Sequence, residues 1–304
     1  MATRLLTRHH TSTSTSPSLA PSYTTQGPTT ALIELESWAA RSSSPGGSIL
    51  SSPPPYTSPH TFTPTVQLQI HTAGKPWLSL PLPPKPVPIP IFPVDGGNDA
   101  PSSEPRYTSI RPAQNSGSSY LVSGSGEAKL STTTYRFGPR KPPVVSLFLP
   151  SPGDEEQEAW DTFPVQSTSL LSRSQRLQHT RLGTFEWRYA SRSERKALKA
   201  NSVLVFEKIV RVAVAGGKEE EVRRTVAMLV RSEETRTPGS SASTAGNGGR
   251  LMVDLSAWDE GDKTEREMLV VLIVTTALVM LKKEVDRRRA AQIAIMASAA
   301  SGGS

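Results

Sequence analysis

The sequence predicts a mainly β protein: a closed or nearly closed antiparallel barrel of about twelve strands around a central hydrophobic C-terminal helix. Three observations predict this fold class. Residues 1–61 form a low-complexity arm, short alternating segments recur through residues 62–255, and an uncharged apolar run occupies residues 268–281. The barrel domain is therefore expected over residues 62–297, between a disordered arm and a short tail at 298–304.

The N-terminal arm is rich in Ser, Thr and Pro. Such a segment cannot bury enough apolar surface to offset the entropy lost on ordering, so residues 1–61 are expected to be disordered. Its Ser-Pro and Thr-Pro pairs are candidate phosphorylation sites. One apolar island, residues 31–38, spaces Leu32, Leu35 and Trp38 at helical intervals, and we expect it to dock on protein partners if the arm serves a scaffold.

Apolar and polar residues alternate with a period of two in several segments, which predicts strands. Val66, Leu68 and Ile70 alternate with polar residues, and so do the aromatic residues of the segment 185–189. Prolines at 83–93 indicate an edge strand or an extended polyproline segment, and residues 201–214 read as one strand or two. Further strands are expected at residues 75–82, 106–110, 119–123, 131–137, 142–149, 222–231 and 251–255.

The C-terminal helix is predicted over residues 263–297, with Asp262 or Thr264 as its cap. Its apolar run, 268–281, is interrupted only by two threonines. The run spans about 21 Å at 1.5 Å per residue, whereas a bilayer core needs about 30 Å. A helix that is apolar on every face must be surrounded, and the strands are available to surround it. A short membrane anchor is the alternative, since basic residues follow the run.

Four blocks of the chain resemble segments of an uncharacterised fungal protein family: residues 134–139 (TYRFGP), 185–189 (FEWRY), 245–251 (AGNGGRL) and 280–289 (MLKKEVDRRR). That family is similar to the tubby C-terminal-like barrels, which include the LURP-one-related proteins and the phospholipid scramblases. The resemblance covers residues 62–297 and implies a barrel around a hydrophobic helix. It also implies phosphoinositide binding in a basic pocket, although no pocket residue of that family can be matched here. The scramblases' cysteine-rich segment has no counterpart.

Catalytic and metal-binding signatures are missing from the sequence. The 304 residues include no cysteine, which excludes disulfides, thiolate metal sites and a cysteine nucleophile. The five histidines show no metal-binding spacing, and no phosphate-binding loop or nucleophile elbow occurs. We therefore expect no enzyme, cofactor or metal. We expect a cytoplasmic protein, peripheral to a membrane or nuclear; the acid-free start is a weaker sign of mitochondrial targeting.

Basic clusters are the remaining functional signal in a chain of net charge +7. The candidate anionic-ligand patch consists of Arg188, Arg192, Arg195, Lys196, Lys199, Arg287, Arg288 and Arg289, with Arg173, Arg176 and Arg181 upstream. Such clusters suit anionic phospholipids at a membrane surface, and a non-enzymatic lipid-binding module is the favoured function. A solvated surface paired with acidic residues, a scaffold module and a membrane-anchored protein stay open. No recognition motif accompanies the charge, so nucleic-acid binding is not expected.

Overall fold

The computed structural model describes residues 61–301, apart from short stretches at 83–84, 96–99, 114–115, 125, 127, 137–140, 149–158, 170–171, 215–217 and 259–261. Nearly all of the predicted arm, including the island at 31–38, therefore lies outside the described residues, as does the end of the predicted tail at 302–304.

A single antiparallel sheet contains the thirteen strands of the described residues, in the order β7-β6-β5-β4-β3-β2-β1-β13-β12-β11-β10-β9-β8. The strands are β1 (Val66–Ile70), β2 (Ile89–Pro93), β3 (Tyr107–Ile110), β4 (Ser119–Ser123), β5 (Lys129–Thr134), β6 (Val144–Phe148), β7 (Ala159–Pro164), β8 (Gln166–Ser167), β9 (Gln175–His179), β10 (Gly183–Tyr189), β11 (Ser202–Val214), β12 (Lys218–Arg231) and β13 (Arg250–Val253). The helical segments are α1 (Arg192–Ala197), the single 3-10 turn η1 (Ser256–Trp258) and α2 (Lys263–Ser301).

The two edges of this sheet meet, which makes it a nearly closed barrel. β7 and β8 stand at opposite ends of the strand order, yet only Val165 separates them along the chain. Beside this junction the Asp161 carboxylate on β7 accepts hydrogen bonds from the Thr180 backbone N–H (2.8 Å) and hydroxyl (3.0 Å), next to β9. The predicted barrel is therefore confirmed, and its closure removes nearly all exposed strand edges.

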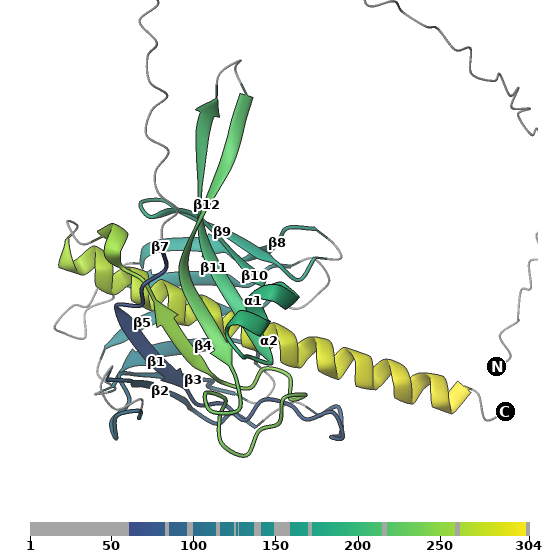
Figure 1. The fold of residues 1–304 in the computed structure, drawn as a ribbon. Coiled ribbons are helices and arrows are strands. Elements are labelled where there is room, and N and C mark those ends of the chain that lie inside the picture. Colours follow the sequence, from purple (N-terminus) through teal and green to yellow (C-terminus); the bar gives the residue numbers. More distant parts are fainter. Residues whose placement is uncertain are drawn as a thin grey trace, which may run out of the picture. The chain divides into compact units, whose positions relative to one another are not determined.

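Helix α2 passes through the barrel, as Figure 1 shows, and its segment from Met268 to Leu281 is buried except for the half-buried Leu278. The two threonines of the apolar run both have partners. Thr275 shares a hydrogen bond of 2.7 Å with Ser131, and Thr276 accepts one of 2.9 Å from the Trp187 indole. Because an unpaired buried hydroxyl costs about 1–3 kcal/mol, these bonds let a polar pair sit inside an apolar core. The prediction of a central hydrophobic helix is confirmed.

Two segments that contain prolines differ from their predicted structure. Residues 76–82 form a loop, since Pro76 and Pro81 have no N–H to donate to a ladder. In contrast, β2 lies between β1 and β3 rather than at an edge. Pro90 lies opposite Thr108 of β3, and Pro93 lies opposite Leu68 of β1. Their carbonyls accept hydrogen bonds from His71 and Ser102, which follow β1 and precede β3, so the missing proline N–H groups fall beyond the ends of those strands.

Other elements differ from the predicted ones in extent. Helix α2 continues to Ser301 rather than ending at residue 297, because the alanine-rich sequence there favours a helix. The segment predicted at 201–214 is one strand, β11, and its pairing with β12 shifts register after Phe206, where β12 has one extra residue, Val226. Strands β7, β8 and β9 and helix α1 were not predicted. For α1 a signal existed: Ser191 and Glu194 form a capping box.

Candidate functional site

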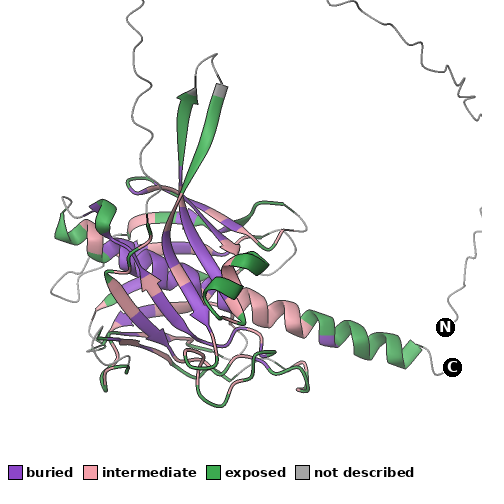
Figure 2. Cartoon of the chain, in the orientation of Figure 1, coloured by how far each residue is buried: buried purple, intermediate pink, exposed green. Residues whose placement is uncertain are grey.

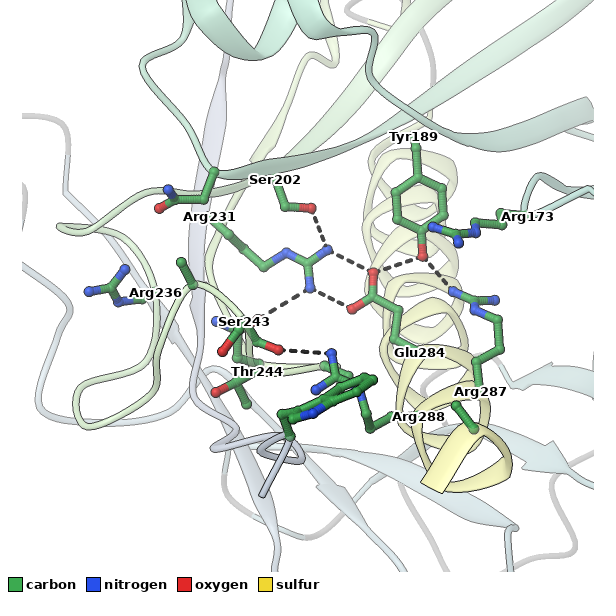
Figure 3. Close-up of a pocket in the computed structure, with 16 residues that line it drawn as sticks. Arg173, Tyr189, Ser202, Arg231, Arg236, Ser243, Thr244, Glu284, Arg287 and Arg288 are labelled. Carbon is green, nitrogen blue, oxygen red and sulfur yellow. Dashed lines mark hydrogen bonds and ion pairs between the residues drawn. The ribbon is translucent and has the colours of Figure 1, made fainter. Parts of the chain in front are cut away.

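A pocket of about 480 Å³ lies at the rim of the barrel where α2 leaves it. Its lining comes from the C-terminal ends of β10 and β12, the start of β11, the loop before β13 and the polar part of α2. Figure 3 shows the charged side chains that line it. Among the described residues that line this arginine pocket, five are arginines and one is a carboxylate, that of Glu284: the arginines are Arg173, Arg231, Arg236, Arg287 and Arg288.

The floor of the arginine pocket is a buried ion pair. Arg231 donates to both carboxylate oxygens of Glu284, at 2.6 and 2.8 Å, and the two side chains are only 5% and 10% exposed. Tyr189 and the Gly246 backbone N–H also donate to this carboxylate, at 2.8 and 2.9 Å. Burial alone would raise the pKa of Glu284, but these hydrogen bonds outweigh it and lower the pKa, so the carboxylate stays ionised.

Gly246 explains why the loop can approach the helix so closely. Its backbone φ is +68°, and a Cβ atom there would come within 2.5 Å of the Leu281 carbonyl oxygen and of the Val285 side chain. Only glycine accepts both the left-handed conformation and this contact. The glycine-rich segment 246–249 thus places an N–H on Glu284 and completes the floor of the pocket.

The remaining arginines form the wall of the pocket. Arg287 donates to the Tyr189 hydroxyl (2.6 Å), and Arg288 donates to the Ser243 carbonyl (2.9 Å) while its guanidinium lies 4.6 Å from the centre of the Trp77 ring. One buried nitrogen of Arg288, Nη1, has no hydrogen-bond partner among the described residues. Arg236 approaches a carboxylate only at 3.9 Å, on the exposed Glu233. Within the part of the chain that the structure describes, the wall therefore carries positive charge that no lining carboxylate balances.

A second pocket, of about 490 Å³, lies on the opposite face of α2. It is also basic, with Lys85, Arg111, Lys282 and Arg289 in its lining. One of these cations is paired, since Lys282 contacts Asp286 at 2.6 Å, as Arg231 is paired with Glu284 in the arginine pocket. Arg289 donates to the Pro81 carbonyl at 3.4 Å. Basic residues of α2 thus face both sides as the helix leaves the barrel.

The structure divides the predicted anionic-ligand patch between several places. Arg287 and Arg288 line the arginine pocket, and Arg289 lines the second pocket. Arg188 lies elsewhere, on the outer face of β10, where it contacts Glu207 (2.8 Å) and Glu194 (2.7 Å). Those contacts satisfy its guanidinium and raise its pKa further.

The rest of the predicted patch lies on helix α1 and on the turn that follows it. Arg192, Lys196 and Lys199 are exposed, and Arg195 donates to the Asn201 carbonyl at 3.2 Å. This segment joins β10 to β11, and the adjoining ends of those strands line the arginine pocket. Of the upstream arginines, Arg173 lines the pocket, Arg176 binds Glu186 (2.9 Å), and Arg181 lies over Trp160.

Sequence reasoning missed several residues of the pocket: Trp77, Tyr189 as a hydrogen-bond donor, Arg231 and Arg236. It expected Glu284 only as one of the acids that pair with the basic surface. The Arg231–Glu284 pair joins positions 53 residues apart, which no local pattern shows. A usable signal was the ionisable residue that follows the apolar stretch 226–230, since Arg231 ends β12.

Neither a family model, nor a curated protein, nor a solved structure matches this chain. Among the described residues, no group of three or more histidine or acidic side chains is arranged to hold a metal ion. None of the described helices is long and apolar enough to cross a membrane.

Proposed function

We propose that this protein is a non-enzymatic, tubby-like binding module that holds anionic phospholipid headgroups in the arginine pocket. The observation that carries the proposal is the imbalance of five arginines against one carboxylate in a single pocket. A guanidinium presents a planar fork of donors that matches the oxygens of a phosphate group. Since Arg231 is already held by Glu284, the arginines of the wall are the ones available to a phosphate.

The size of the pocket supports a headgroup as its ligand. Its volume of about 480 Å³ lies within the range of small-molecule sites, about 300–1,000 Å³. The exposed bases Arg192, Lys196 and Lys199 follow β10 on the same rim, and each basic residue near an anionic membrane contributes about 1 kcal/mol. Anionic lipids are concentrated in cytoplasmic leaflets, which fits the expected cytoplasmic, membrane-peripheral localisation.

The scaffold function stays a prediction of the sequence alone, because its docking segment at 31–38 lies outside the described residues. Deleting residues 1–61 tests it: partners that bind through the arm are lost on deletion, whereas binding to anionic lipid stays.

Sedimentation of the full chain with lipid vesicles tests the lipid proposal. We expect binding to vesicles that contain phosphoinositide or phosphatidylserine, weakened by salt, and little binding to phosphatidylcholine alone. The double variant Arg173→Ala/Arg236→Ala leaves the buried pair intact and should bind about thirty-fold more weakly, from about 1 kcal/mol for each charge. Arg211→Ala is the matched control, because Arg211 is an exposed arginine outside the pocket.

Two results would contradict the proposal: no binding to anionic vesicles at low salt, or an equal loss for the Arg211 control. A soluble inositol phosphate added as competitor separates the possible sources of the phosphate group. If it binds the pocket while anionic vesicles do not, the ligand is a free phosphorylated molecule rather than a lipid.

A further inference from the structure

The loop from residue 76 to 82 exposes large apolar side chains beside the arginine pocket. Leu78 is 95% exposed, Leu80 67%, Leu82 62% and Trp77 51%. Exposed apolar side chains are common singly, but a cluster of this kind marks an interaction surface. Trp77 itself also lines the arginine pocket, so the apolar loop and the pocket adjoin.

Hydrogen bonds donated by two side chains of α2 and by Lys75 hold this loop in place. Gln292 of α2 donates to the Trp77 carbonyl (2.7 Å), Arg289 to the Pro81 carbonyl (3.4 Å), and Lys75 to the Leu80 carbonyl (2.6 Å). The donors thus satisfy the loop's backbone on one side while its leucine side chains stay in solvent. A loop supported in this way can present apolar groups without burying unpaired backbone carbonyls.

The exposed apolar surface continues along the end of α2. Ile295 and Met296 follow Gln292 by about one helical turn, so they lie on the face of the helix that holds the loop. Each is 54% exposed. Figure 2 shows this final part of α2 as almost wholly exposed. Loop and helix together form what we call the apolar edge: Trp77, Leu78, Leu80, Leu82, Ile295 and Met296.

Three consecutive arginines of α2 lie between the apolar edge and the barrel, and we call them the cationic collar: Arg287, Arg288 and Arg289. Arg288 packs on the Trp77 ring, Arg289 holds the loop at Pro81, and Arg287 lies one residue further toward the barrel. This order, apolar side chains outermost and cations behind them, complements an anionic bilayer. Apolar side chains enter the acyl boundary to a depth of about 5–10 Å, while tryptophan and arginine stay at the headgroup level.

We propose that the apolar edge inserts into an anionic lipid bilayer and thereby orients the arginine pocket toward the headgroups. This inference rests on the proposed lipid-binding function and adds to it a specific mode of attachment. A purely electrostatic surface would need no exposed leucines. A protein partner would meet the same leucines, but the cationic collar favours a surface of dense negative charge.

Vesicle sedimentation of the full chain with Leu78→Ser/Leu80→Ser tests the insertion. Both side chains are exposed, so the variant should keep its fold, while its binding to phosphatidylserine vesicles should fall by about ten-fold or more. Val210→Ser/Val212→Ser is the matched control: these valines of β11 are 46% and 44% exposed and should be neutral. In addition, lipids brominated at the end of the acyl chain nearest the headgroup should quench the fluorescence of the wild type more than that of Trp77→Phe.

The variants separate the two proposals. If the leucine variant binds as well as the wild type while Arg173→Ala/Arg236→Ala loses binding, the insertion is wrong and the headgroup pocket stands. If the leucine variant loses binding while the arginine variant keeps it, the insertion stands and the headgroup pocket fails. If the wild type dimerises without lipid and the leucine variant abolishes only the dimer, the apolar edge is a contact between two copies and the insertion is overturned.

Discussion

Two arginine-rich regions of this protein differ in how their charge is balanced. The outer face of β9 to β12, together with Glu194 of α1, carries a ladder of ion pairs, which we call the charge ladder. It joins Arg176, Arg188, Arg211 and Arg223 to Glu186, Glu194, Glu207 and Glu221. In the arginine pocket, the described lining residues include five arginines and one carboxylate. Arginine therefore stabilises the sheet in the charge ladder, whereas in the arginine pocket its charge is available to a ligand.

The sheet itself explains the ladder. Register places Glu186 directly opposite Glu207 on neighbouring strands, and both are nearly buried. Two like charges in that position would destabilise the sheet. Arg223 reaches both carboxylates, at 3.4 and 3.3 Å, and the arginines beside it complete the balance. Availability of charge thus depends on the partners that the fold supplies, and three variants test this difference.

The largest effect is expected at the floor of the pocket. Glu284→Ala leaves the Arg231 guanidinium buried without its partner, so the free energy of unfolding should fall by about 3–5 kcal/mol. Urea unfolding measures the change. Glu219→Ala in the exposed ribbon, where the nearest arginine nitrogen is 3.9 Å away, is the control and should change little. If Glu284→Ala were as stable as the wild type, the buried pair would not support the pocket.

A smaller effect is expected in the charge ladder. Arg188→Ala removes the bonds to Glu207 and Glu194, and it should lower the free energy of unfolding by about 1 kcal/mol, discounted because the side chain is 27% exposed. Vesicle binding should not change, since Arg188 is already neutralised. If Arg188→Ala lost vesicle binding without losing stability, Arg188 would belong to the lipid-binding surface. The charge ladder and the arginine pocket would then not differ in the way described.

A third test concerns the dependence of stability on pH. Burial, together with the charge of Arg287, lowers the pKa of Lys283 to about 8, and this lysine donates to the Gln175 side chain. The folded chain therefore loses this proton near pH 8, whereas the unfolded chain keeps it up to the ordinary lysine pKa of 10.5. Because the unfolded state binds more protons between these values, stability should rise with pH in that window and show no dependence on this residue below it.

Lys283→Met should remove that rise, as urea unfolding at a series of pH values would show. Lys196→Met, at an exposed lysine of α1, should keep it. A rise that persists in Lys283→Met would assign the proton to another group.

The sequence predicted the barrel because its strongest signals are local. The run at 268–281 is apolar on all faces and too short for a bilayer, so strands had to surround it. Strand β9 shows where local reasoning failed. Of its five residues only Leu177 is apolar, yet Gln175 and His179 are buried, because contacts supplied by other elements cover them. Burial of polar residues depends on partners that periodicity does not show.

For the site, the sequence by itself determined where positive charge is dense: Arg287, Arg288 and Arg289 stand together at the end of the apolar run. Only the tertiary structure decided which charges are balanced. It placed Glu284 on Arg231, 53 residues away, and Arg188 between two glutamates. The physical reason is that a side chain carries its charge wherever it lies, whereas neutralisation requires an opposite charge within a few ångströms, and the fold alone sets that distance.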